Sequence, residues 1–509
     1  MRRTSAVAAA TFALLALACG PAILVPRLHP VAETPRLAPS ARGLKVHMVS
    51  GELYVFDTWT LDPEGKVLDG HGDRFSAGRE QRGSGEYSLP VDAIALLETN
   101  DREVAGSLGL AGLGALTVFW GGASVYCAAN PKSCFGSCPT FYLEDDPGRP
   151  RAEGFSSSIA RVLEARDVDA LPDARPRGDR LVVWMRNEAL ETHAVRRVRL
   201  LAAPKPAGTR VFAGADGRFH PASRLHPPLA CGGPEGDCLA AVTRDDGLER
   251  RSAADAEDLA TREDLELRFD RPTGPSGLVI AARQSLLTTF LFYQTLAYLG
   301  ANAGDWLASV ERGTREDARS LMGMERLLGG IEIAVAEEGG WHTLGTFAEA
   351  GPIAGDVAVF PLEPSRGRAP LRVRLRSAKG HWRIGWAALA ELRPPVEAQV
   401  VPLDSVQRDG RVDAAGLARL REGRRHLVTQ PGDAYRLSFR VPVAPAELFL
   451  ESEGYYYEWM RREWLAEEDP AMAALVVARP DEALRRLAGP FKAAEAGAEQ
   501  AFWASRFRR

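Results

Sequence analysis

The chain contains 509 residues, which at roughly 150 residues per domain is too long for one ordinary hydrophobic core. Hydrophobic residues make up 45% of it and charged residues 26%, a globular balance that excludes disordered, collagen-like and coiled-coil chains. The formal net charge of −4 leaves no basic excess, so we expect no nucleic-acid partner.

Residues 1–18 have the pattern of a secretory signal peptide. Arg2 and Arg3 form a charged start, and the apolar run that follows, 6–18, is too short to span a bilayer comfortably. A small residue, Ala18, stands where such peptides are cleaved. The sequence therefore predicts export.

The stretch from Ala16 to Cys19 resembles a bacterial lipobox, although Ala16 stands where the usual pattern has Leu. The resemblance implies that Cys19 is diacylated through its sulfur and becomes the first residue of the mature protein. Two acyl chains give stable anchoring, whereas one does not. Regularly spaced prolines across 19–42 predict that the lipid anchor continues into an extended tether.

Residues 43–101 are predicted to form a small β module, because apolar residues alternate with polar ones from Leu44 onward. The stretch 69–73 is expected to be a glycine-rich turn with solvated carboxylates. A cation site mainly of oxygen ligands is the alternative for this part of the chain. Its ligands would come from Asp57, Asp69, His71 and Asp73.

Residues 102–132 are predicted to form an apolar helix. No charged residue occurs from Val104 to Pro131, and glycines recur at short intervals. The length would permit a bilayer span, and the glycines would let another helix approach closely. The sequence leaves two roles open for this segment, a helix packed on the protein and a helix in contact with a membrane.

The rest of the chain predicts an α+β, β-rich fold of several antiparallel β modules. A central β-rich domain, 133–330, contains an uncharged aromatic stretch, 285–304, that is expected to be a buried helix. An antiparallel β domain, 331–450, follows, because apolar and polar residues alternate along its strands. Residues 451–509 are predicted to be a helical tail in which Pro490 separates the last two helices.

Trp382 and Trp386 lie four residues apart in one predicted strand, so we expect them to project to the same face. Burial in the core is the expectation for both. An open face carrying them would instead make a platform for stacking sugars.

Five cysteines remain after Cys19. In an exported chain disulfides are the default, and the loop-forming residues between Cys231 and Cys238 predict a local bridge. Cys127, Cys134 and Cys138 form a cluster of three, in which one bridge leaves one thiol free; we expect the bridge between Cys134 and Cys138. The spacings do not fit a zinc site, and we expect no metal and no cofactor.

No sequence motif of a known catalytic or nucleotide-binding site occurs in the chain: there is no GxSxG, HExxH, P-loop, GxGxxG after a strand, or EF-hand loop. Glu188, Glu191 and His193 are the one candidate acid–base cluster, because a carboxylate beside an imidazole raises the pKa of the ring and orients it. The same residues are equally suited to a turn whose side chains cap neighbouring strands.

The block from Asn130 to Tyr142, which contains Cys134-Phe-Gly-Ser-Cys138-Pro-Thr-Phe-Tyr142, resembles a family of uncharacterised bacterial lipoproteins. Further similar pieces extend the resemblance over most of the mature chain: 153–158, 186–188, 283–288, 454–457 and 502–505. The resemblance implies an exported, lipid-anchored protein and carries no activity, cofactor or ligand with it.

We therefore expect a lipid-anchored protein of the cell envelope, on the outer membrane of a Gram-negative bacterium. Its predicted role is non-enzymatic: binding or scaffolding, with an envelope protein or a glycan as partner. The alternative is an envelope hydrolase or a thiol-dependent enzyme that uses Glu188 and His193 or an unpaired cysteine.

Overall fold

The structure is a computed structural model of the full chain. It describes the following residues: 22–29, 44–48, 52–75, 81–104, 138–189, 191–271, 274–303, 306, 323–337, 340–348, 351–363, 370–442, 444–458 and 467–504. The chain forms two compact units, each treated by itself below. The first contains residues 1–126, 299–306 and 460–468, and the second contains 127–298, 307–459 and 469–509.

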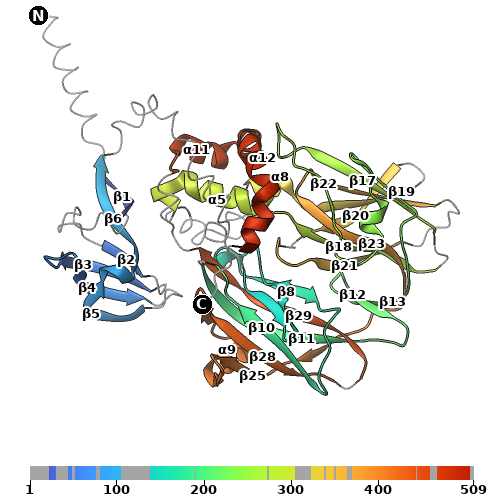
Figure 1. The fold of residues 1–509 in the computed structure, drawn as a ribbon, viewed down its shortest axis with the longest axis horizontal. Coiled ribbons are helices and arrows are strands. Elements are labelled where there is room, and N and C mark those ends of the chain that lie inside the picture. The colour runs from blue at the N-terminus through green and yellow to red at the C-terminus, as the bar shows by residue number, and fades with distance from the viewer. Residues whose placement is uncertain are drawn as a thin grey trace, which may run out of the picture. The chain divides into compact units, whose positions relative to one another are not determined.

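The first unit is built on one antiparallel sheet, whose strands are seen in blue in Figure 1. Its order is β1-β6-β2-β3-β4-β5, and a short 3-10 helix, η2, precedes β6. The bounds are β1 (Ala22–His29), β2 (Leu44–Met48), β3 (Leu53–Leu61), β4 (Val67–Phe75), β5 (Gln81–Pro90), η2 (Val91–Ala93) and β6 (Ile94–Val104). Strands β2 to β6 thus lie where the sequence predicts a small β module.

The predicted glycine-rich turn at 69–73 is wrong, because these residues lie inside strand β4. Gly70 gives room to the ring of Phe56, and a side chain on Gly72 would meet the backbone oxygen of Val55. The missing Cβ atoms allow the neighbouring strand β3 to come close. In the sequence, glycines that serve this purpose cannot be told from glycines of a turn.

Replacing Gly72 by Ala should therefore destabilise the first unit by about 1–3 kcal/mol, because backbone cannot move aside as a flexible side chain does. Gly85→Ala is the matched control, since a Cβ there has no neighbour within 4 Å and should change the stability by less than about 0.5 kcal/mol. Chemical unfolding of both variants measures the difference. Equal stabilities would contradict the close approach.

The described residues of the second unit form four sheets, and two of these combine strands from near both ends of the unit. Sheet B is β26 (Arg411–Val412), β25 (Leu403–Arg408), β28 (Ala434–Arg440), β10 (Arg180–Arg186), β7 (Thr140–Leu143) and β8 (Asp146–Glu153), in that order. Sheet C is β24 (Gln399–Val401), β11 (Glu191–Pro204), β29 (Ala446–Glu458) and β9 (Ala165–Ala170), and β27 (Leu427–Thr429) pairs with β11. Helix α9 (Ala414–Glu422) contacts both sheets, through β25 and β11.

Five strands of sheet D close into a ring, because β13 pairs with β12 on one side and with β23 on the other. The sheet is β13 (Phe219–His226), β12 (Arg210–Gly214), β21 (Asp356–Leu362), β18 (Ser276–Gln284), β23 (Trp382–Leu392) and β16 (Arg250–Arg251). Sheet E is β15 (Gly236–Asp237), β14 (Ala230–Gly233), β17 (Arg262–Phe269), β22 (Leu371–Ala378), β19 (Ile331–Glu337) and β20 (Gly340–Phe347). Only β12 and β21 are parallel among the described strand pairs.

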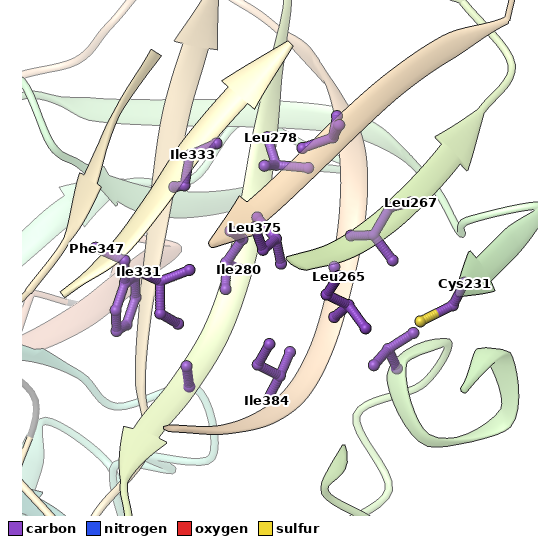
Figure 2. Close-up of a cluster of buried hydrophobic side chains, with 14 of the residues drawn as sticks. Cys231, Leu265, Leu267, Leu278, Ile280, Ile331, Ile333, Phe347, Leu375 and Ile384 are labelled. Carbon is purple, nitrogen blue, oxygen red and sulfur yellow. The ribbon is translucent and has the colours of Figure 1, made fainter. Parts of the chain in front are cut away.

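Along the strands of the ring, alternate side chains point to opposite faces and pack in two different hydrophobic clusters. Val279 and Ala281 of β18 pack with Trp386 of β23 in one cluster. Leu278 and Ile280 belong to another, in which they pack with side chains of sheet E; Figure 2 shows them near Leu375, Ile331 and Ile333. Sheet E therefore covers one face of sheet D, and a strand buried on both faces needs the continuous apolar sequence that β18 has.

Trp382 and Trp386 are both buried, as expected, but the prediction that they share a face is wrong. A β-bulge shifts the register of β23 between the partners of Ala281 and Ala282, so Gly385 is an extra residue. Trp382 consequently packs in the cluster with sheet E and Trp386 in the other cluster. No sugar platform is formed by this pair, since each ring lies in a core.

The helices of the second unit have these bounds: η3 (Arg161–Leu163), α4 (Leu239–Val242), α5 (Leu287–Leu299), α8 (Gly323–Leu328), α11 (Pro470–Ala478) and α12 (Pro480–Ala504); η4 (Gly300–Asn302) follows α5. Helix α5 lies within the stretch 285–304, and its buried residues lie on more than one side of it. Helix α12 contacts α11 and α8 (Figure 1). Its Phe491 packs against Phe290 of α5.

Two predicted boundaries differ from the structure. Strand β29 continues to Glu458, so the helical part of the tail begins later than residue 451. Helix α12 runs through Pro490 without ending there, contrary to the predicted separation. Residues 446–458 are buried almost continuously and do not alternate, so the sequence did not indicate where this strand ends.

The predicted division at residue 330 is not a boundary between domains. Strand β10 pairs with β28, β11 with β29, β17 with β22, and β18 with β23, so every sheet of the second unit combines strands from both sides of it. The predicted helix at 102–132 lies outside the described residues, except that 102–104 belong to β6. Of the helices that the structure describes, none has the length and apolar character that a membrane crossing requires.

Candidate functional site

The predicted acid–base residues lie at one end of the long pairing between β11 and β29. In this register Glu191 is opposite Glu458, and His193 is opposite Tyr456. Residues two apart on a strand share a face, so the four side chains form one group, here called the buried ionisable cluster. Its members lie almost entirely away from solvent; Glu191 is 0% and His193 1% exposed.

His193 meets a carboxylate within hydrogen-bond distance, since its Nε2 lies 3.0 Å from Oε1 of Glu191. Glu458, across from Glu191, accepts a hydrogen bond from the hydroxyl of Tyr293 on α5. Tyr456 donates its hydroxyl to the carbonyl oxygen of Ser156 at 3.2 Å. The cluster is thus covered by helix α5 and by the chain around Ser156.

Glu188 has a different role from the predicted one. Its Oε2 accepts a hydrogen bond of 2.6 Å from the hydroxyl of Tyr142 on β7, whereas Glu191 is the carboxylate that meets His193. The side-chain amide of Asn187 donates to the carbonyl oxygen of Glu191 at 2.9 Å, which fixes the turn between β10 and β11. The structure therefore separates Glu188 and His193 into two hydrogen-bonded pairs.

Cys138 lies next to this cluster and is buried. Burial raises the pKa of the Cys138 thiol well above its ordinary value, and the nearby carboxylates Glu153, Glu191 and Glu458 raise it further. Burial also raises the pKa of Tyr456, to which Cys138 and Tyr293 contribute. A thiolate needs an electropositive, partly exposed setting, so this environment disfavours the thiolate of Cys138 wherever its sulfur is not bridged.

The arrangement brings together a thiol, an imidazole and carboxylates, which are the groups of a thiol enzyme. It lacks the two conditions that such chemistry needs, an accessible nucleophile and a charge environment that favours the thiolate. Its side chains are instead held by hydrogen bonds within the protein, His193 to Glu191 and Tyr293 to Glu458.

Iodoacetamide should leave Cys138 unlabelled in the native protein near neutral pH, because the buried thiol stays protonated. A Cys127→Ser, Cys134→Ser chain excludes bridges to the other two cysteines of the cluster, and peptide mass mapping reads Cys138 directly. The same chain unfolded in urea is the positive control. Rapid labelling of native Cys138 would show that the cluster opens to solvent.

A second group of carboxylates lies where β9 and β21 contact each other. Burial raises the pKa of Asp169 well above its ordinary value, and the charges of Asp167, Asp356 and Glu153 raise it further. Asp169 Oδ2 is buried and has no hydrogen-bond partner among the described residues. Desolvation raises the pKa of Asp356 to about 6, against the hydrogen bond from the backbone amide of Val357.

These raised values make folding favour the protonated carboxyls. The folded-state pKa of Asp356, about 6, lies above the ordinary 3.8, so its stabilising effect is complete below pH 3.8 and is lost as the pH rises to about 6. Above pH 6 the ionised Asp356 should weaken the second unit.

Asp356→Asn should therefore raise the free energy of unfolding by about 1–3 kcal/mol near pH 8 and change it little near pH 4. Asp264→Asn, on an exposed position of sheet E, is the matched control and should stay within about 0.5 kcal/mol at both pH values. Urea unfolding at the two pH values measures this. A gain of the same size at low pH would contradict the assignment.

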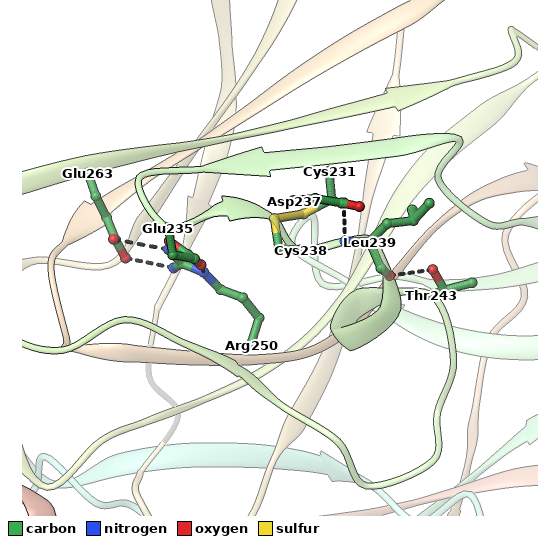
Figure 3. Close-up of a disulfide and its surroundings, with 8 residues drawn as sticks. All are labelled: Cys231, Glu235, Asp237, Cys238, Leu239, Thr243, Arg250 and Glu263. Atoms are coloured by element: carbon green, nitrogen blue, oxygen red, sulfur yellow. Dashed lines mark hydrogen bonds and ion pairs between the residues drawn. A yellow bond between two sulfur atoms is a disulfide. The ribbon is translucent and has the colours of Figure 1, made fainter.

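The predicted bridge between Cys231 and Cys238 is present, with Cα atoms 5.1 Å apart. Figure 3 shows it beside Arg250, which is 4% exposed and bonds two carboxylates. The guanidinium donates to Glu235, in the loop closed by the disulfide, at 2.6 and 2.8 Å, and to Glu263 of β17 at 2.7 and 3.0 Å. The pairs bind the disulfide loop to the sheet, and removing one partner of such a group leaves a buried charge uncompensated.

The remaining predicted site residues have these places. Cys19, Cys127 and Cys134 lie outside the described residues, so the lipidation of Cys19 and a bridge between Cys134 and Cys138 stay predictions. Within the described part of the chain, no group of His, Cys, Asp and Glu side chains is arranged to hold a metal ion. Asp69, one of the proposed cation ligands, instead accepts a hydrogen bond from the hydroxyl of Ser88.

Comparisons with family models and with curated proteins found no match to this chain. Among solved structures, a chain from the structure of the infectious bursal disease virus Gx strain is 11% identical over 68% of this chain and 86% of that one, with a TM-score of 0.11. A TM-score this low does not indicate a shared fold.

Sequence reasoning missed the parts of the cluster that come from distant strands, Tyr456 and Glu458, and from helix α5, Tyr293. The spacing of Glu191 and His193 on one strand was the only local indication. Asp169 and Asp356 gave none, because their strands lie far apart in the sequence and neither strand carries a motif of a buried acid.

Proposed function

We propose that this protein is an exported, lipid-anchored component of the cell envelope, on the outer membrane of a Gram-negative bacterium, and that it binds or scaffolds rather than catalyses. Cys19 is the proposed lipid attachment site, and 19–42 the tether. An envelope protein or a glycan is the proposed partner. The resemblance to uncharacterised bacterial lipoproteins supports the same assignment.

The burial of the Glu191–His193 pair is the observation that carries the non-catalytic part of the proposal. With 0% and 1% of these residues exposed, a substrate has no access to the pair in this conformation. The two side chains instead bond each other on β11, and beside them Glu458 of β29 bonds Tyr293 of α5. The Cys231–Cys238 disulfide supports an oxidising compartment.

The chain should incorporate radiolabelled palmitate when expressed in a Gram-negative host, and Cys19→Ala should abolish the label and release the protein into the soluble fraction. Cys134→Ala is the matched control and should keep both label and membrane attachment. Crosslinking in living cells then identifies what the anchored protein contacts. Absence of palmitate from the wild-type chain, with residues 1–18 retained, would overturn the proposal.

A thiol-dependent enzyme or hydrolase is the second candidate, and the proximity of Cys138 to Glu191 and Tyr456 is the observation that favours it. It requires a conformation in which the cluster opens and Cys138 loses its proton. Labelling of native Cys138 by iodoacetamide, described above, separates the two candidates, because only the enzyme needs a reactive thiol.

A further inference from the structure

The face of sheet E that turns away from the core carries a row of charged side chains. Leu371, Val373 and Leu375 of β22 point into the core, so Arg372, Arg374 and Arg376 lie on the opposite face. The neighbouring strands place acidic residues beside this row: Asp264 and Glu266 on β17, and Glu332 on β19. Most of the charges on this face are therefore matched within the sheet.

Arg374 is the exception in this row. Arg372 pairs with Glu266 at 2.8 Å, and Arg376 lies 3.6 Å from Asp264. Arg374 forms no ion pair with any described carboxylate, because Glu266, its cross-strand neighbour, bonds Arg372 and its other neighbour is Ala334. Its Nε is buried without a hydrogen-bond partner.

The guanidinium of Arg374, which has no ion pair with a described carboxylate, lies over the ring of Trp341 of β20 in a cation–π contact. The centroid of the Trp341 ring is 4.7 Å from the guanidinium carbon of Arg374 and 5.4 Å from that of Arg372. The cross-strand neighbour of Trp341 is Ala336, and Ala334 is opposite Thr343, so small side chains leave room across β19 between Trp341 and Arg374. Trp341 remains partly exposed.

From this arrangement we infer that the outer face of sheet E binds a carboxylated sugar of an anionic glycan, with the carboxylate on Arg374 and the sugar ring against Trp341. An unpaired arginine provides a fork of donors that matches one carboxylate. An indole provides a flat apolar surface for a ring. The inference rests on the proposed binding function and names the chemistry of its partner.

The composition of the face favours a sugar over a protein partner. The core of a protein interface is apolar and depleted of charged residues. Here one partly exposed aromatic ring is surrounded by charges, by Ala334 and Ala336, and by the hydroxyls of Thr343 and Thr346. Charged and hydroxyl side chains of this kind bond the hydroxyl groups of a sugar.

Titration calorimetry of the purified full-length protein with a short oligogalacturonate tests the inference, and the carboxyl-reduced, neutral oligosaccharide is the matched ligand control. The acidic oligosaccharide should bind and the neutral one should bind at least about tenfold more weakly. Arg374→Gln should lower the affinity about ten- to hundredfold, because a charge-assisted pair is lost. Trp341→Ala should also lower it.

Arg376→Gln is the matched control variant, since Arg376 stands in the same row but faces Asp264, and it should change the affinity less than about threefold. Circular dichroism and melting curves establish that each variant is folded. Equal binding by wild type and Arg374→Gln, equal binding of the neutral oligosaccharide, or Arg374-dependent binding of polyglutamate in place of oligogalacturonate would overturn the inference. If the protein carries palmitate on Cys19 but does not bind oligogalacturonate, the glycan assignment is wrong and the anchor stands. If it binds oligogalacturonate but carries no palmitate, the anchor is wrong and the glycan assignment stands.

Discussion

The pairing of β11 with β29 is the constraint on which the second unit depends. It joins residues 191–204 to 446–458 along almost their full lengths, so strands separated by about half of the chain become neighbours. The buried ionisable cluster lies at one end of the pairing. Farther along, Glu451, whose side chain is 1% exposed, forms ion pairs with Arg199 and Arg166. Every other feature near the cluster takes its place from this register.

Such a register determines which polar groups are buried together. Glu191 and Glu458 are brought face to face because their strands pair, and not because either sequence is suited to a buried acid. Hydrogen bonds hold these buried groups, as Tyr293 does for Glu458. Desolvation in general favours the neutral form of a buried acid. The same physics acts on Asp169 and Asp356, where two carboxyls share a low-dielectric region. A buried polar group is therefore no indication of catalysis until access to it is established.

Local pattern predicted much of the fold. The alternation of Leu371, Val373 and Leu375 with arginines gave the strand and its core face, and the uncharged aromatic stretch gave helix α5. Pairing partners could not be predicted, since alternation is the same whichever strand lies alongside. The bulge at Gly385 places Trp386 on the opposite face from Trp382. Strand β4 has glycines because it packs closely on Phe56, and the sequence therefore resembles a turn.

The surface of sheet E illustrates why a binding residue could not be predicted from the sequence alone. The three arginines of β22 look equivalent in the sequence, because each alternates with an apolar residue. Their differences come from the neighbours: β17 supplies a carboxylate that bonds Arg372, and β19 supplies only Ala334 beside Arg374. An unpaired charge is a property of the register between strands far apart in the chain. Binding sites on sheets of this kind are therefore found by following each charge to its cross-strand partner, and the one without a partner is where a ligand gains most.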